Sequence, residues 1–214
     1  MKLPELPTAT LRLRIDAQAL AANWCTLDRL SGSAAAGAAV KANAYGLGVA
    51  HAVPVLRDAG ARDFFVAHWS EVPALLEHVQ PEQVSVLHGP LSAEDAAFAQ
   101  ATGVRPVINS AYQAGVWLQA GGGSCDLMVD SGINRLGISL EELGDPAITS
   151  LQIDTVMTHL ASADEDVAQN ARQLALFREI APQVPARGRS VANSAGIALG
   201  PEYAFDLTRP GLAL

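Results

Sequence analysis

Short apolar runs alternate with alanine-rich segments along almost the whole chain, and this alternation is the feature that most limits its possible folds. A short apolar run is typical of a buried parallel strand, and a longer alanine-rich segment is typical of a helix. We predict eight barrel strands at 38–42, 63–69, 83–89, 104–109, 125–130, 153–160, 189–194 and 205–211. A separate alternating strand is expected over Leu11–Asp16, and a helix from about Asp16 to Leu30.

Eight strands joined by helical segments predict a (β/α)8 barrel of the TIM type, although an open doubly wound sheet shows the same alternation. The positions of the polar residues favour the barrel, because its active site is built from side chains at the carboxyl ends of the strands. The predicted strands end on Lys41, His68, His88, Asn109, Asp130, His159, Ser194 and Arg209. The chain stops at Leu214, directly after the eighth strand, so we expect a barrel truncated before its closing helix.

The composition limits the number of domains and the class of ligand. With 214 residues, of which 50% are hydrophobic, we assign residues 1–214 to a single domain. A net charge of -8 argues against nucleic acid and anionic membranes as partners, whereas small anionic ligands can still be bound by local charges. The N-terminus lacks the apolar core of a signal peptide and no run is long enough to span a bilayer, so we expect a cytoplasmic protein.

Lys41 lies at the end of a small apolar run, where a buried strand would normally carry another aliphatic residue. At the mouth of a barrel its ammonium group would be partly desolvated, which lowers the pKa and leaves an amine that is nucleophilic toward aldehydes. A lone lysine more often packs its stem and extends its charge into water. The neighbours favour the chemical interpretation, because hydroxyls and glycine amides after the last two strands commonly bind phosphate in barrels. Tyr45, Ser194 and Gly211 supply such groups, and an amine beside a phosphate site indicates pyridoxal phosphate.

Five separated motifs resemble, in order, those of the alanine racemase family. They are V-K-A-N-A-Y-G-L-G (Val40–Gly48), D-S-G-I-N-R-L-G (Asp130–Gly137), T-H-L-A-S-A-D (Thr158–Asp164), A-N-S-A (Ala192–Ala195) and F-D-L-T-R-P-G (Phe205–Gly211). The resemblance extends from about residue 11 to residue 214. It implies a barrel of fold type III among pyridoxal phosphate enzymes. It also implies an isomerase that interconverts L-alanine and D-alanine, for cell-wall peptidoglycan or for D-alanine catabolism.

The resemblance implies a cofactor-binding role for five residues of this chain. In the family, the residue that matches Lys41 carries the cofactor covalently. The residues that match Tyr45, Ser194, Gly211 and Leu212 hold its phosphate.

Three further residues receive catalytic roles from the resemblance. The residue that matches Arg135 contacts the cofactor phenolate and the substrate carboxylate, and the one that matches His159 supports the cofactor ring and the second catalytic base. The residue that matches Arg209 contacts the pyridine nitrogen. An arginine is always charged and cannot accept the nitrogen's proton, so it should limit charge delocalisation into the ring and suppress transamination. Taken alone, Arg209 could instead pair with Asp206 or Glu202 at the barrel rim.

Three residues depart from the family pattern. Leu47 and Ser190 stand where histidines are common, and the second of these often hydrogen-bonds the arginine that matches Arg209, so we expect weaker support for that side chain. Met128 stands where many members have a carbamylated lysine that orients the arginine matching Arg135. A thioether cannot form that charge-assisted bond, so we expect substrate-carboxylate binding to be loosened or supported differently.

The family's chain continues into a β-rich C-terminal domain that is absent here, and residues 1–16 are expected to form a strand that pairs with it. In the family, that domain of the partner subunit supplies a tyrosine as the second base, which implies a homodimer with shared sites. The spacing of His68 and His88 fits no common metal motif, and we assign no metal. Two other functions remain open: a non-catalytic single-domain pyridoxal phosphate carrier, and a pyridoxal-dependent aldolase of the same fold.

Overall fold

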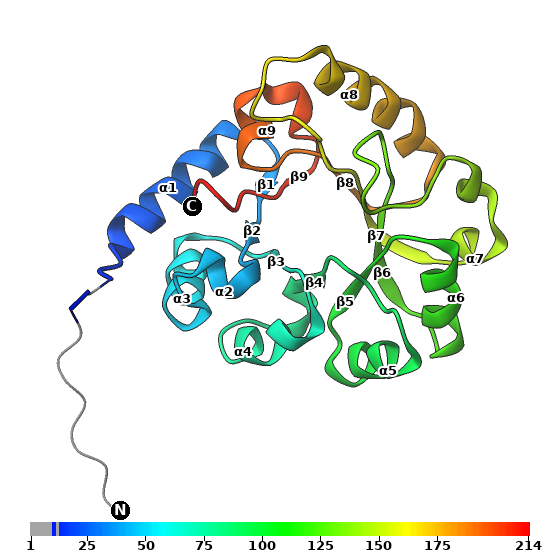
Figure 1. The fold of residues 1–214 in the computed structure, drawn as a ribbon, viewed down its shortest axis with the longest axis horizontal. Coiled ribbons are helices and arrows are strands. Elements are labelled where there is room, and N and C mark those ends of the chain that lie inside the picture. The colour runs from blue at the N-terminus through cyan, green and yellow to red at the C-terminus, as the bar shows by residue number, and fades with distance from the viewer. Residues whose placement is uncertain (1–9, 12) are drawn as a thin grey trace, which may run out of the picture.

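The computed structural model describes residues 10, 11 and 13–214 of the chain. Strands and helices alternate, with the helices outside a ring of strands (Figure 1). The strands are β1 (Ala35–Ala36), β2 (Ala38–Ala39), β3 (Phe64–Val66), β4 (Val84–Val86), β5 (Arg105–Ile108), β6 (Ser124–Met128), β7 (Gln152–Met157), β8 (Gly188–Ser190) and β9 (Leu207–Thr208).

The helices include the one that the sequence predicts from about Asp16 to Leu30. They are α1 (Ala17–Leu30), α2 (Lys41–Tyr45), α3 (Val49–Ala59), α4 (Val72–Leu76), α5 (Ala93–Thr102), α6 (Ala111–Gln119), α7 (Pro146–Thr149), α8 (Ala168–Ile180) and α9 (Ser194–Ala198). Short 3₁₀ turns are η1 (Trp69–Glu71), η2 (Pro81–Gln83), η3 (Glu141–Gly144), η4 (Ala181–Gln183) and η5 (Pro201–Tyr203). None of the helices in the described part of the chain is long and apolar enough to cross a membrane.

The strands form a closed parallel barrel, which confirms the predicted fold class. β2 to β8 pair in chain order as a seven-stranded sheet, and β1 pairs with β9. Gly37 joins β1 and β2 into one extended segment, and its N–H donates to Thr208 O at 2.9 Å. On the other side, the Arg209 N–H donates to Ala192 O at 2.8 Å, so β9 connects the two edges of the sheet.

Each predicted barrel strand overlaps a strand of the structure that ends earlier than predicted. β6, β7 and β8 begin one residue before their predicted ranges, and the sequence does not predict β1. The predicted strand over Leu11–Asp16 does not form in the residues described there, 11 and 13–16. Asp16 instead begins α1, because its Oδ1 accepts the Gln18 and Ala19 N–H groups at 3.0 Å each. Residues 1–9 lie outside the described residues, so pairing of the N-terminal segment with another domain stays a prediction, as does the single-domain assignment.

Alternation along the strands divides the barrel interior into layers. An apolar middle layer is formed by Ala39, Phe65, Val107, Met128, Met157 and Leu207. Lys41, His159 and Arg209 each lie two residues after a member of this layer, namely after Ala39, Met157 and Leu207. Arg105 and Asp126 each lie two residues before a member, namely before Val107 and Met128. The barrel therefore carries polar side chains both above and below an apolar layer.

Candidate active site

Lys41 begins a turn of left-handed backbone at the carboxyl end of the first barrel strand. Ala42, Asn43 and Ala44 have φ between 52° and 54°, and Tyr45 has φ 53°, although none of them is glycine. Such residues cost about 1–2 kcal/mol each in this conformation. Two observed contacts offset the cost: Asn43 Oδ1 accepts the Val49 N–H at 2.8 Å, and the Ala42 N–H donates to a carboxylate of η1. Strained backbone that is held in place by its surroundings is typical of functional sites.

That carboxylate belongs to Glu71, which the sequence analysis did not single out. Its Oε1 accepts the Ala42 N–H, and its Oε2 accepts the Ala67 and His68 N–H groups at 2.7 and 2.9 Å. Glu71 therefore joins the ends of β2 and β3. Its signal in the sequence is an acidic residue three positions after His68, the N-cap of η1, which is a capping-box pattern.

The amine of Lys41 has a pKa below its usual value. Burial lowers it most, the positive charges of Arg135 and Arg209 lower it further, and Glu71 acts in the opposite direction. These effects match the partial desolvation expected from the sequence. A larger fraction of this amine is neutral near pH 7 than is usual for a lysine.

Arg209 lies inside the barrel with 5% of its surface exposed. Its Nη2 donates to Thr158 O at 2.6 Å, and its Nη1 donates to Ser190 Oγ. Burial lowers its pKa to about 10, and the negative charge of Asp126 acts against this shift. The side chain remains a cation at neutral pH, and it pairs with neither Asp206 nor Glu202 among the described contacts.

Ser190 hydrogen-bonds Arg209 directly, so the guanidinium keeps a partner at this position, and weaker support than a histidine gives stays a prediction. The hydroxyl is fully buried, donates to Leu207 O and accepts from Arg209. Serine fits because β8 lies beside β9, so a short side chain reaches the guanidinium. The hydroxyl thus occupies the place where a histidine is common in the family.

His159 follows β7 and lines the same cavity as Lys41 and Arg209. Burial lowers its pKa to about 3, and the positive charges of Arg209, Arg135 and Lys41 add to the shift. The imidazole is therefore neutral at physiological pH. Gln173 fixes the backbone here, since its Nε2 donates to His159 O at 3.0 Å.

Ser194, Gly211 and Tyr45 meet after the last two strands, as predicted for a phosphate site. Ser194 Oγ accepts the Gly211 and Ala213 N–H groups at 2.9 and 3.2 Å. A Cβ on Gly211 would lie 2.5 Å from Tyr45 Oη and 3.0 Å from Ala39 Cβ. Glycine is therefore required here, because any side chain would displace the tyrosine hydroxyl from this cradle.

Arg135 lies on an exposed loop between β6 and η3. Asp130 shapes this loop by accepting the N–H groups of residues 132–134 at 2.8 to 3.2 Å. Within the described residues, Arg135 forms no ion pair. Met128 lines the same cavity and offers no anionic acceptor, and altered support for this guanidinium stays a prediction.

One cavity of about 760 Å³ at the carboxyl ends of the strands gathers all eight predicted site residues. They are Lys41, Tyr45, Arg135, His159, Ser194, Arg209, Gly211 and Leu212. Two other residues predicted for this rim have structural roles instead: Asp130 caps a loop, and the buried Asn109 donates to Leu87 O. His88 lines the cavity and meets the exposed His68 edge to face, with ring centroids 4.1 Å apart.

Fold and site together define a class of protein: a parallel (β/α)8 barrel with a cationic ligand cavity at the carboxyl ends of its strands. Comparison with known sequences gives the particular family. The family model described as "Alanine racemase, N-terminal domain" matches residues 15–214, and the chain belongs to this family.

Named relatives agree with this assignment. An alanine racemase of Rhizobium meliloti is 44% identical over 224 residues, which cover 100% of this chain and 59% of that protein. A biosynthetic alanine racemase of Agrobacterium fabrum is 40% identical, covering 96% of this chain and 55% of that protein. The chain thus spans somewhat more than half the length of these relatives.

Solved structures show the same fold. Alanine racemase from Bartonella henselae with covalently bound pyridoxal phosphate superposes with a TM-score of 0.83 at 35% identity, over 92% of this chain and 61% of that chain. The enzyme from Corynebacterium glutamicum gives a TM-score of 0.84 at 28% identity, over 94% and 61% of the two chains.

Proposed function

We propose that this chain is the cofactor-binding domain of a pyridoxal phosphate-dependent racemase that interconverts L-alanine and D-alanine. The observation that carries the proposal is a single cavity in which the desolvated amine of Lys41 lies with the buried cation Arg209. The names of the relatives and the cofactor in the Bartonella henselae structure support it. The space between Gly211 and the Tyr45 hydroxyl also fits a phosphate group, because a side chain at Gly211 would collide with that hydroxyl.

Each end of the cofactor has candidate binding groups in the cavity. Lys41 would bind the carbonyl carbon, and the Tyr45 hydroxyl, the Ser194 hydroxyl and the backbone amides of Gly211 and Leu212 would bind the phosphate. When bound, the cofactor supplies a conjugated system that stabilises negative charge at the substrate's α-carbon. The protein's part is to orient the reacting groups, to exclude water and to move protons.

Arg209 is proposed to face the ring nitrogen. Its two hydrogen bonds, to Thr158 O and Ser190 Oγ, fix the guanidinium plane. Since the side chain stays charged at neutral pH, it can donate a hydrogen bond to the nitrogen but cannot act as its proton acceptor. Charge at the α-carbon is then less spread into the ring, which favours reprotonation at that carbon over transamination.

Arg135 and His159 are proposed to act on the substrate side of the cavity. Arg135 would bind the substrate carboxylate and the cofactor phenolate, both of which suit a guanidinium. His159 would pack against the ring as a neutral imidazole, since its pKa of about 3 prevents a further positive charge there.

Racemisation needs a proton donor or acceptor on each face of the α-carbon. Lys41 can serve one face. Neither Tyr112, which is 65% exposed, nor the buried Tyr203 lines the cavity, so neither offers the second face. We propose that the second base comes from a partner subunit, in a cytoplasmic homodimer with shared sites.

The first experiment tests the cofactor assignment. The chain is incubated with pyridoxal phosphate, the lysine–cofactor bond is reduced with borohydride, and the adduct is mapped by peptide mass spectrometry. We expect the adduct on Lys41 and none on Lys2, the other lysine of the chain. Lys41→Ala should abolish it, and Lys2→Ala should retain it. An adduct on Lys2 alone would contradict the assignment.

The second experiment separates the racemase from a cofactor carrier. Deuterium incorporation into each alanine enantiomer is measured for residues 1–214, together with a racemisation assay. We expect exchange on one face only and negligible racemisation by this chain alone. Efficient racemisation would show that the second base lies within these residues. No exchange at all, with the cofactor bound on Lys41, would favour the carrier.

A further inference from the structure

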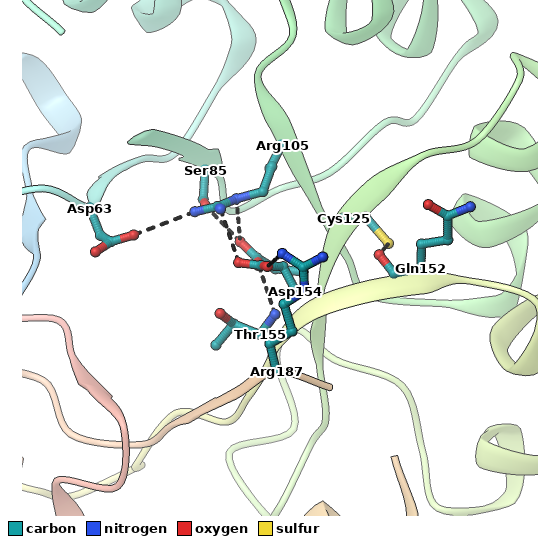
Figure 2. Close-up of polar contacts among 9 residues, drawn as sticks. Asp63, Ser85, Arg105, Cys125, Gln152, Asp154, Thr155 and Arg187 are labelled. Atoms are coloured by element: carbon teal, nitrogen blue, oxygen red, sulfur yellow. Dashed lines mark hydrogen bonds and ion pairs between the residues drawn. The ribbon is translucent and has the colours of Figure 1, made fainter. Parts of the chain in front are cut away.

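A polar cluster lies in the barrel interior near the amino-terminal ends of the strands, across the apolar layer from the cavity (Figure 2). Arg105, at the start of β5, is surrounded by three carboxylates. Its nitrogens lie 3.0 Å from Asp154, 3.5 Å from Asp63 and 3.8 Å from Asp126. Ser85 of β4 also belongs to the cluster. The cluster therefore connects five consecutive strands, β3 to β7, with Asp63 directly before the first residue of β3.

Asp126 is the most buried of these carboxylates, with 1% of its surface exposed. Ser85 Oγ donates to its Oδ2 at 2.6 Å, and the backbone N–H of Thr155 donates to its Oδ1 at 3.1 Å. The second contact is unusual, because a backbone amide within a strand normally donates to the neighbouring strand's backbone.

A β-bulge explains this contact. β6 and β7 pair regularly except between Cys125 and Leu127, where the register shifts by one residue. There, one residue of β6, Asp126, faces two residues of β7, Asp154 and Thr155. An extra residue in a bulge is left without its regular partner. The carboxylate of Asp126 takes the place of the missing backbone acceptor.

The bulge reverses which residues of β7 face inward. Ile153 packs in the outer apolar cluster, whereas Met157, four positions later, packs in the inner layer. Regular alternation would place both on the same side of the sheet. A shift of one residue moves every later side chain to the other face. Without the bulge, His159 would point toward the surrounding helices instead of the cavity.

We propose that Asp126 is a positioning residue for the cofactor cavity. By holding the β7 bulge, it directs His159 into the cavity and places Thr158 O where it accepts from Arg209. The inference rests on the proposed function only in treating this cavity as the pyridoxal phosphate site. The bulge itself is independent of any ligand.

The competing explanation for Asp126 is its charge. It faces Arg105, and its negative charge also acts on Arg209. The two explanations differ for Asp126→Asn, which removes the charge but keeps an oxygen for the Thr155 N–H and can still bond Ser85. They also differ for Asp154→Asn, which removes an equal charge beside Arg105 and leaves the Thr155 bond intact.

The experiment compares Asp126→Ala, Asp126→Asn and the control Asp154→Asn with the unchanged chain. Hydrogen–deuterium exchange is followed in the peptide 152–160 without cofactor, with the peptide 49–59 of α3, which lies outside the polar cluster, as internal reference. Affinity for pyridoxal phosphate is measured separately. For Asp126→Ala we expect faster exchange confined to 152–160 and affinity lowered by about tenfold, the lower end of the range for lost supporting contacts. The two Asn variants should match the unchanged chain in both readouts.

Two results would contradict a positioning role for Asp126. A folded Asp126→Ala with unchanged exchange and affinity overturns the proposal. Asp126→Asn with the same defects as Asp126→Ala also overturns it, in favour of a charge role. Should the alanine variant not fold, Asp126→Ser removes the same acceptor while keeping a hydroxyl for Ser85, and it is judged by the same criteria. If the unchanged chain binds no pyridoxal phosphate, the proposed function fails, and the exchange measurement still decides the role of Asp126.

Discussion

His159 should make the folded chain lose stability as the pH falls below about 6.5. Its pKa is about 3 in the folded chain, against the usual histidine value of 6.5. Burial is the main cause, followed by the positive charges of Arg209, Arg135 and Lys41. Between these two pH values the unfolded chain binds a proton that the folded chain does not, so the free energy of unfolding rises with pH across this window.

The size of the effect follows from linkage. One proton of difference between the two states changes the free energy of unfolding by about 1.4 kcal/mol per pH unit. With the two pKa values above, His159 should remove about 2 kcal/mol of stability between pH 7 and pH 5. The loss should continue toward pH 3, where the folded chain also begins to bind the proton.

Urea unfolding of the cofactor-free chain at pH 7 and pH 5 measures this contribution. In His159→Gln, a side chain of similar size that does not titrate replaces the imidazole. Between pH 7 and pH 5 this variant should therefore lose about 2 kcal/mol less of its free energy of unfolding than the unchanged chain loses. The control His51→Gln, on the exposed face of α3, should keep the original pH dependence. A difference below about 0.5 kcal/mol, which is within ordinary non-additivity, would refute the neutral, buried imidazole.

Three further predictions concern the cofactor site. Gly211→Ala places a Cβ 2.5 Å from Tyr45 Oη and should weaken cofactor binding by about tenfold, as lost supporting contacts do, whereas Gly115→Ala, with nothing within 4 Å, should leave it unchanged. Ser190→Ala leaves a buried guanidinium N–H without its acceptor and should cost about 1–3 kcal/mol in urea unfolding; a neutral effect would argue against this hydrogen bond. In the full-length form of the proposed racemase, Arg209→Glu should raise pyridoxamine phosphate formation relative to racemisation, and an unchanged ratio would contradict the role proposed for this arginine.

The sequence predicts the barrel and several members of the cavity because both depend on local patterns, whereas Arg135 and Leu212 are assigned through the family resemblance alone. Apolar runs mark the strands, and a polar residue directly after each run marks the rim. In a parallel barrel all strands end at the same rim, so Lys41, His159 and Arg209 can be assigned to one site without knowing any distance. The cavity contains all three.

The supporting contacts could not be predicted in this way, because they depend on which strands become neighbours. The left-handed turn after Lys41 contains no glycine, and alanine is normally the best helix former, so its sequence predicts the wrong hand. Ser190 reaches Arg209 only because β8 and β9 adjoin in the closed barrel. The bulge opposite Asp126 likewise appears only when two strands are paired, since the sequence of β7 alone reads as one unbroken strand.

The electrostatics of the cavity differ in sign from those of the whole chain. The chain carries a net charge of -8, yet Lys41, Arg135 and Arg209 act on one another within a single cavity. Their positive charges favour anionic groups such as a phosphate and a carboxylate. The same charges, added to burial, lower the pKa of Lys41 and keep its amine available as a nucleophile. One arrangement of cations thus supports two requirements of the proposed chemistry, and Glu71 limits the shift by raising the same pKa.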